Sequence, residues 1–355
     1  MGLTAIEKIL ARTSGRDVVR PGEVAVCKPD IVLHIDLPMA IEGAWYKPKK
    51  IFDTDRVAMI FDHAVPSPTI KDASAMAEGR RMAKEFGLKR VFDVGRHGIA
   101  HVVAAENGLA RPGELLVCAD SHTCASGGLN CAGRGAGIPD TLQAMTKGIV
   151  WYPVTPTVRY EFKGKLNPSV CGKDVFFHIA QTWGGHGNTS IEYGGPGLKS
   201  LTVADRRTIA TMSAEVGAEF ALFDYDELTA EYLQGRLDRP ATPAQAVKCS
   251  VAPLMVSGCS TSQMRPSATV AALLVVVWGR KTAKVSPAIR VSWSRSRRRD
   301  FSLSATSCRR RSPASCPMLM LRSAKEEMLR TMMLAPSSRD SEIVRRARRL
   351  GSPVS

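Results

Sequence analysis

The sequence predicts an α/β fold with a doubly wound, mainly parallel sheet over residues 1–245. Continuous apolar runs of strand length alternate there with amphipathic stretches of helix length, and glycine and proline mark the turns between them. Such alternation is typical of layered α/β proteins. Titratable side chains follow several of the apolar runs, and ligands of parallel sheets bind beyond the carboxyl ends of the strands. We therefore expect the functional site at those ends.

The first elements are one helix and three strands. A Thr-x-x-Glu capping box that starts at Thr4 predicts a short amphipathic helix. Strands are expected at residues 24–27, 31–36 and 57–61. The third strand is apolar throughout, as strands inside parallel sheets are, and it leads directly to Asp62 and His63. His34, within the second strand, is expected to be structural rather than catalytic.

The next segments bring further titratable residues to the ends of apolar runs. A helix is expected at residues 72–86, strands at 91–94 and 115–119, and a short strand-like segment at 99–101. His97 precedes this short segment and His101 ends it, whereas Asp120, Ser121 and His122 follow the strand at 115–119. Together with the acid and histidine after the earlier strand, these residues predict one shared active site.

The backbone after the strand at 115–119 decides how its polar residues are arranged. An extended chain would place Asp120 and His122 on one side and Ser121 on the other. That geometry suits a histidine oriented by a carboxylate, and it argues against a hydrolase triad among these three residues. The glycines between residues 127 and 137 would let backbone N–H groups approach a ligand closely.

The remaining elements continue the alternation. Helices are expected at residues 137–148, 173–183 and 204–218, and strands at 157–163 and 221–223. Glu192 follows an apolar residue in a loop rich in glycine. It is a candidate partly buried carboxylate that exchanges a proton or orients a histidine, and a purely structural loop residue is the alternative.

Composition limits the class of protein. The net charge of +16 comes from residues 246–355, which hold 21 Lys and Arg against 5 Asp and Glu, because residues 1–245 hold 28 of each class. Nine cysteines without a Cys-x-x-Cys pair are typical of a reducing cytoplasm, and no apolar run is long enough to cross a membrane. The sequence contains no fingerprint of a dinucleotide, nucleoside triphosphate, serine-hydrolase or zinc-protease site. The sequence therefore gives no motif-based support for a function in any of these four protein classes.

Four segments form a recognisable series. They are Phe61-Asp62-His63, Gly98-Ile99-Ala100-His101, Ala119-Asp120-Ser121-His122-Thr123 and Ile191-Glu192-Tyr193-Gly194-Gly195-Pro196-Gly197. In order and approximate spacing they resemble the aconitase superfamily, and more closely the large subunits of the 3-isopropylmalate dehydratase and homoaconitase type. The resemblance covers residues 1–245. It implies a three-layer α/β/α fold and a hydro-lyase, as in leucine biosynthesis, that moves water reversibly between neighbouring carbons of a hydroxy di- or tricarboxylic acid.

The resemblance also implies a set of site residues and partners. The matching active-site positions are Asp62, His63, His101, Asp120, Ser121, His122 and Glu192. His101, paired with a carboxylate, would help to protonate the departing hydroxyl, and Glu192 would contact an iron-bound water. A 4Fe-4S cluster with one iron free of cysteine would act as a Lewis acid. The base that removes the carbon-bound proton would come from a small subunit, so the resemblance implies a heterodimer.

The cysteine ligands for such a cluster are incomplete in this sequence. Residues 257–262 resemble the family's first ligand motif, and Cys259 is the candidate ligand within it. Cys308 and Cys316 match none of the family's later cysteines, although such a cluster needs at least three thiolates. A catalytically inactive or truncated remnant without a cluster is therefore the alternative to an active enzyme.

Residues 246–355 form a divergent region rich in arginine and serine, with arginine runs at 297–299 and 309–311. Its composition predicts an irregular or disordered segment. One hypothesis is a basic tail that binds nucleic acid by neutralising phosphates. We favour the alternative that this region is translated out of frame from a GC-rich gene, so nucleic acid is not an expected partner.

Overall fold

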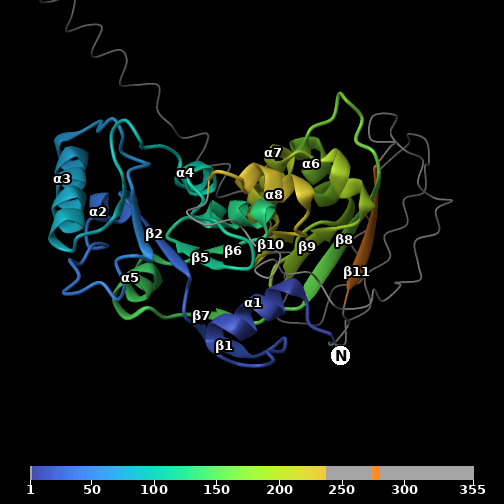
Figure 1. The fold of residues 1–355 in the computed structure, drawn as a ribbon, viewed down its shortest axis with the longest axis horizontal. Coiled ribbons are helices and arrows are strands. Elements are labelled where there is room, and N and C mark those ends of the chain that lie inside the picture. Colours follow the sequence, from blue (N-terminus) through green and yellow to red (C-terminus); the bar gives the residue numbers. More distant parts are fainter. Residues whose placement is uncertain (1, 237–272, 280–355) are drawn as a thin grey trace, which may run out of the picture. The chain divides into compact units, whose positions relative to one another are not determined.

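The computed structural model describes residues 2–236 with side chains and residues 273–279 as backbone (Figure 1). The chain divides into two compact units, Met1–Val285 and Ser286–Ser355, and the second lies wholly outside the described residues. The expected boundary at residue 245, the candidate ligand Cys259 and the arginine runs of the tail also lie outside them.

A five-stranded parallel sheet in the order β4-β3-β2-β5-β6 organises the first part of the chain. Its strands are β2 (Ile31–Ile35), β3 (Val57–Ile60), β4 (Arg90–Phe92), β5 (Leu115–Cys118) and β6 (Ala132–Gly135). The sequence predicts the first four of these strands. It misses β6, because two of the four residues in that strand are glycine.

Both faces of this sheet are covered, which gives the predicted α/β/α layers. Along β5, Leu115 and Val117 belong to one apolar core, whereas Leu116 and Cys118 belong to another, as the period of two in a strand requires. The first core includes residues of α1 (Ala5–Ser14), α3 (Ile70–Glu85) and α5 (Ile138–Lys147). The second includes residues of α4 (Ala100–Glu106), α7 (Val203–Met212) and α8 (Glu227–Leu233).

A second sheet has the order β10-β9-β8-β11. Its strands are β8 (Thr157–Gly164), β9 (Ser190–Gly194), β10 (Ala221–Phe223) and β11 (Leu273–Gly279). The first three are parallel, and β11 pairs antiparallel with β8, so the two sheets are mainly parallel as predicted. Residues of α6 (Gly172–Trp183) and α7 belong to the apolar core on this sheet. The strand β11 is not predicted from its apolar run.

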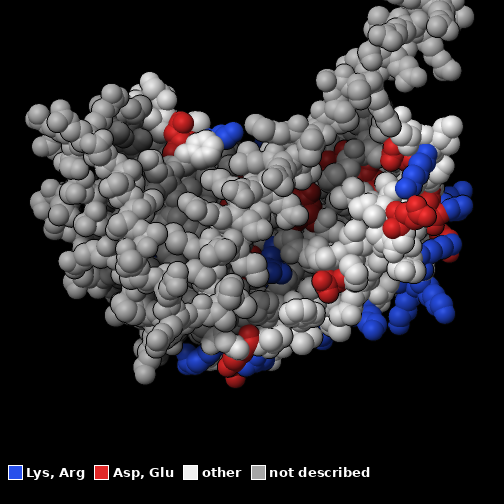
Figure 2. Space-filling view, turned by 180° about the vertical axis from the view of Figure 1, so that it is seen from behind, with Lys and Arg blue, Asp and Glu red and all other residues white. Residues whose placement is uncertain are grey.

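Smaller elements complete the described chain. Strand β1 (Val24–Cys27) pairs antiparallel with β7 (Val150–Pro153), which the sequence analysis misses, and α2 (Leu37–Ala40) is a single turn. None of the described helices is both long and apolar enough to cross a bilayer. On the face in Figure 2, basic and acidic side chains of the described residues are mixed, in keeping with the equal numbers of both in residues 1–245.

Two expectations about the backbone near the site are wrong. His101 lies in helix α4 and not at the end of a strand, because the Asp62 carboxylate accepts the N–H of Ala100 at 2.7 Å and so satisfies the start of that helix. The chain after Asp120 is not extended. It forms the 3-10 helix η1 (Ser121–Leu129), whose first turn the Asp120 side chain caps through the N–H of His122.

Two other segments also differ from the expectations. Glu192 lies in strand β9 and not in a loop, since its backbone is held between β8 and β10. The helix expected at 204–218 is broken into α7 and the 3-10 helix η3 (Ser213–Val216), and η2 (Pro196–Ser200) precedes them.

The glycines after Asp120 are explained by packing within the protein. A Cβ on Gly127 would lie 1.5 Å from the carbonyl oxygen of Ala221 in β10. A Cβ on Gly135 would lie 2.4 Å from the carbonyl oxygen of Asp120. These glycines therefore let η1 lie directly against β10 and let β6 lie directly against the segment that begins with Asp120.

Candidate active site

The centre of the site is a histidine–carboxylate pair. His101 Nε2 lies 2.8 Å from Asp120 Oδ1, and the same oxygen accepts the backbone N–H of His122 at 2.8 Å. The hydrogen bond with His101, together with the N–H of His122 and the charges of both histidines, lowers the pKa of Asp120 from 3.8 to about 2. Asp120 therefore remains a carboxylate near neutral pH and favours a proton on Nε2 of His101.

A buried aspartate that the sequence analysis does not single out holds the turn after β3. Asp36 is fully buried, and its carboxylate accepts the backbone N–H groups of Asp62, His63 and Ala64 at 3.2, 2.9 and 2.8 Å. Three such bonds fix the turn that carries His63. The only sequence signal for this role is its position at the end of the strand expected at 31–36.

His63 lies beside the central pair. Its Nε2 is 3.7 Å from Asp120 Oδ2, and its Nδ1 is 3.8 Å from Asp62 Oδ2. The His63 side chain is 34% exposed, whereas that of His101 is only 9% exposed. A substrate in solution can therefore reach His63 more readily than His101.

The third histidine has a carboxylate partner from a distant part of the chain. His122 Nε2 lies 2.8 Å from Glu215 Oε1, and His122 Nδ1 lies 3.2 Å from the hydroxyl oxygen of Ser121. Glu215 belongs to η3, which η1 contacts. The sequence analysis misses Glu215 because the residue lies within an expected helix, 93 positions from its partner, with no local motif to mark it.

Glu192 occupies a different environment from the one expected. It is 1% exposed and thus fully, not partly, buried. Its Oε1 accepts the N–H of Ile6 in the first turn of α1 at 3.1 Å, and its Oε2 lies 3.6 Å from Arg159 Nη1. Both contacts tie β9 to other elements of the fold, since a carboxylate at a helix N-terminus stabilises that helix.

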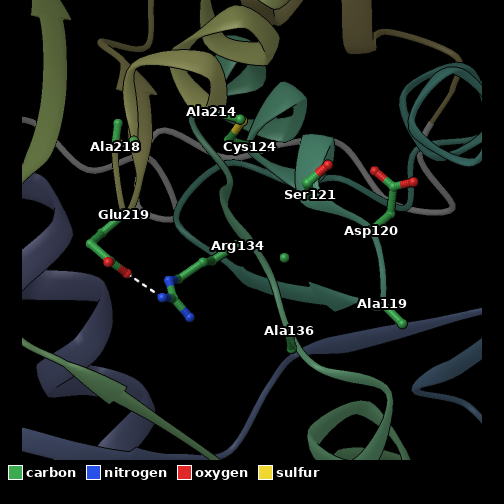
Figure 3. Close-up of a pocket in the computed structure, with 11 residues that line it drawn as sticks. Ala119, Asp120, Ser121, Cys124, Arg134, Ala136, Ala214, Ala218 and Glu219 are labelled. Carbon is green, nitrogen blue, oxygen red and sulfur yellow. Dashed lines mark ion pairs between the residues drawn. The ribbon is translucent and has the colours of Figure 1, made fainter. Parts of the chain in front are cut away.

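A pocket of 380 Å³ adjoins the Asp120–Ser121 segment beyond the carboxyl ends of β5 and β6. It is lined by Ala119, Asp120, Ser121, Cys124, Arg134, Gly135, Ala136, Ala214, Gly217, Ala218 and Glu219. Figure 3 shows Arg134 and its ion-pair partner Glu219 on one side, with Asp120 and Ser121 on the other. The pocket thus combines a cation, a hydroxyl and the carboxylate of the central pair.

The cysteines of the described residues do not form a cluster site. They are Cys27, Cys118, Cys124, Cys131 and Cys171, all with free thiols. Burial raises the pKa of Cys118 and Cys131 far above the usual range and that of Cys124 to about 12, so these thiols stay protonated near neutral pH. Within residues 2–236, no group of three or more His, Cys, Asp or Glu side chains is placed to hold a metal ion. The residues described therefore do not fit a 4Fe-4S cluster.

Three histidines, His63, His101 and His122, each lie beside a carboxylate around the start of η1. Such pairs suit proton transfer to and from a bound acid, because the carboxylate fixes the ring and stabilises its charged form. The structure brings together Asp62, His63, His101, Asp120, Ser121 and His122 as the sequence analysis expects. Glu192 lies in a network of its own with Arg159.

The chain is similar to known proteins of one family. The model of the aconitase family (aconitate hydratase) matches residues 7–277, so the match extends past the limit of residue 245 expected from the sequence. The 3-isopropylmalate dehydratase large subunit of Mycolicibacterium smegmatis is 50% identical over 232 residues, which are 65% of this chain and 54% of that protein. The 3-isopropylmalate dehydratase large subunit of Helicobacter hepaticus is 40% identical over 244 residues. The 3-isopropylmalate dehydratase large subunit 1 of Pyrococcus abyssi is 36% identical over 244 residues. Each match covers 67% of this chain and 58% of the relative.

The chain spans little more than half the length of these curated relatives. The family model nonetheless matches well over half of the chain. The chain belongs to the aconitase family.

Proposed function

We propose that this chain is the large subunit of a hydro-lyase that removes and adds water reversibly on a hydroxy dicarboxylic acid of the isopropylmalate type. The observation that supports the proposal most is the 2.8 Å pair of His101 Nε2 and Asp120 Oδ1 beside a pocket of 380 Å³. The names of the relatives, each a dehydratase large subunit, support the same class of reaction.

Dehydration requires a proton for the hydroxyl that leaves as water and a base for the proton on the neighbouring carbon. A protonated histidine beside a carboxylate is suited to the first task. We assign it to His63 rather than to His101, because His63 is the more exposed of the two and lies 3.7 Å from Asp120. His101 would then hold Asp120 in place from the buried side.

The pair of His122 and Glu215 has a second role in this proposal. Glu215, rather than Glu192, is the carboxylate that orients a histidine of the site, because its Oε1 lies 2.8 Å from His122 Nε2. Ser121, whose hydroxyl lies 3.2 Å from His122 Nδ1, would hydrogen-bond the substrate at the edge of the pocket.

The base for the carbon-bound proton is proposed to come from a partner. The relatives are named large subunits, which supports a small-subunit partner for this chain. A 4Fe-4S cluster is expected from the family, but the described cysteines do not fit one, so no step here depends on it. The same misfit favours a second candidate, a folded but catalytically inactive relative.

Two measurements on one preparation distinguish these candidates. The full chain, mixed with the dehydratase small subunit of the same source, is assayed for hydration of 2-isopropylmaleate, and iron and sulfide bound after anaerobic reconstitution are quantified. Conversion that is lost in His63→Ala supports the hydro-lyase. No conversion, in a chain that stays folded by circular dichroism and binds neither iron nor sulfide, supports the inactive relative.

A further inference from the structure

Arg134 is a cation that lines the pocket beside Asp120 and Ser121, and the roles above leave it unused. It lies in β6 opposite Val117 of β5, and its side chain lines the pocket that Asp120 and Ser121 also line. We propose that Arg134 binds a carboxylate of the substrate in this pocket, a proposal that rests on the proposed function.

The backbone holds Arg134 close to the site. A Cβ on Gly133 would lie 2.2 Å from the carbonyl oxygen of Thr123, and one on Gly135 would lie 2.4 Å from that of Asp120. The residues on both sides of Arg134 are therefore pressed against the start of η1. The position of the arginine relative to Asp120 is thus fixed by packing and not by a loose loop.

Two contacts fix the plane of the guanidinium group. Its central carbon lies 5.5 Å from the centre of the Tyr152 ring, and Nη2 forms an ion pair with Glu219 (Figure 3). Guanidinium groups stack on aromatic faces in this way. The stacking restricts the side chain of Arg134 before a ligand binds, so binding costs less conformational entropy. An arginine held like this is preorganised to receive an anion.

The guanidinium retains donors for a second anion. It has five N–H groups in a planar fork, and the ion pair with Glu219 is made through Nη2. The Arg134 side chain is 30% exposed, so a ligand can reach the remaining donors. A planar carboxylate matches this fork better than a hydroxyl or a carbonyl group, because it can accept two parallel hydrogen bonds.

The charges along the pocket select the orientation of a hydroxy diacid. One carboxylate would pair with Arg134, and the carbon that bears the hydroxyl would then lie toward Ser121 and Asp120, which line the same pocket. A pocket of 380 Å³ is large enough for a small diacid, since ligand pockets generally begin at about 300 Å³. Glu219 is paired with Arg134 and therefore competes with a ligand carboxylate for the guanidinium group.

Arginine modification tests this inference on the unaltered full chain. The protein is treated with phenylglyoxal, with and without malate as the probe, and modified arginines are located by peptide mass spectrometry. We expect malate to slow the modification of Arg134 by about tenfold, as a bidentate carboxylate shields the guanidinium. Arg81, whose side chain is 68% exposed on α3, is the internal control and should react equally in both samples. Equal modification of Arg134 in both samples would overturn the inference.

Binding to variants provides a second test. Arg134→Gln should weaken malate binding by about tenfold in calorimetry, because it removes the charge-assisted bonds. Arg134→Lys should weaken malate binding less than Arg134→Gln does. Glu219→Gln should bind malate more tightly than the wild type, and the control Arg81→Gln should bind it with wild-type affinity. If the wild type binds malate and Arg134→Gln binds it equally well, the assignment of Arg134 is wrong while the proposed hydro-lyase stands. If Arg134 is protected but no hydration activity is found with the small subunit, the carboxylate site stands and the proposed function fails.

Discussion

The Nε2 atom of His101 lies 2.8 Å from the Oδ1 atom of Asp120, although one residue is in helix α4 and the other caps the 3-10 helix η1. Asp62 starts the helix that carries His101, and β5 leads directly to Asp120. The pair thus depends on β3 and β5, which lie on either side of β2 in the parallel sheet and whose carboxyl ends therefore lie at the same edge.

Asp120→Asn should reduce stability in a pH-dependent way. Since the pKa of Asp120 is lowered from 3.8 to about 2 in the folded chain, the charged group stabilises it by about 2 kcal/mol above pH 4. This contribution is present above the unfolded pKa and is lost as the pH falls toward 2. Urea unfolding should show that the free energy of unfolding of Asp120→Asn is lower than that of the wild type at pH 7, and that this difference narrows between pH 4 and 2. A difference that does not change with pH would contradict a stabilising charge on Asp120.

His34→Phe should stabilise the protein in mild acid. His34 is fully buried and stacks on Trp45 at 5.1 Å, and burial lowers its pKa from 6.5 to about 4. Between these values the unfolded chain binds a proton that the folded chain does not, so the wild type loses about 2 kcal/mol at pH 5 relative to pH 8. Free energies of unfolding measured at pH 5 and pH 8 should show this loss of stability in the wild type and not in His34→Phe. A variant that loses the same amount would show that another group is responsible.

Gly127→Ala should be strongly destabilising, because the new methyl group would lie 1.5 Å from the Ala221 carbonyl oxygen and would separate η1 from β10. Overpacking of this kind costs about 1–3 kcal/mol or more. Gly187→Ala is the matched control, since a Cβ at Gly187 meets nothing within 4 Å. Thermal unfolding should give a clear fall in melting temperature for the first variant alone. Similar melting temperatures would exclude the close packing of η1 on β10.

Glu215 and Glu192 should respond differently to the same change. Glu192→Gln should lower stability by about 1–3 kcal/mol, because the carboxylate is buried against Ile6 N–H and Arg159. Glu215→Gln should leave stability within about 0.5 kcal/mol, as its side chain is 55% exposed, while it lowers hydration activity through His122. Unfolding curves and assays on both variants check this. If Glu192→Gln lost activity without losing stability, Glu192 would have a functional role in the site and not only a structural one.

The sequence predicts four of the five strands of the parallel sheet, because these four contain apolar runs bounded by clear turn signals, whereas half of β6 is glycine. The strand β5 and the polar residues after it are found where expected, and so are Asp62 and His63 after β3. The local conformation after Asp120 is not predictable from pattern, because it depends on a side-chain cap and on the packing of Gly127 against β10.

Residues whose partners are distant in the chain are the ones that sequence analysis misses. Asp36 acts on residues 26 to 28 positions away, and Glu215 acts on a histidine 93 positions away. Neither pairing leaves a local motif. The prediction for Glu192 is wrong because a local signal is misleading. The glycines around it indicate a loop, although the segment is the middle strand of three parallel strands.

The role of the His101–Asp120 pair is tested most directly by the hydration of 2-isopropylmaleate by the full chain with its small subunit, compared between the wild type and Asp120→Asn. The wild type should convert the acid, and Asp120→Asn, while still folded at neutral pH, should lose activity by about 100-fold or more, because it removes the carboxylate that stabilises the charged form of the histidine acid. Equal rates for the two proteins would contradict the role of the His101–Asp120 pair in the reaction.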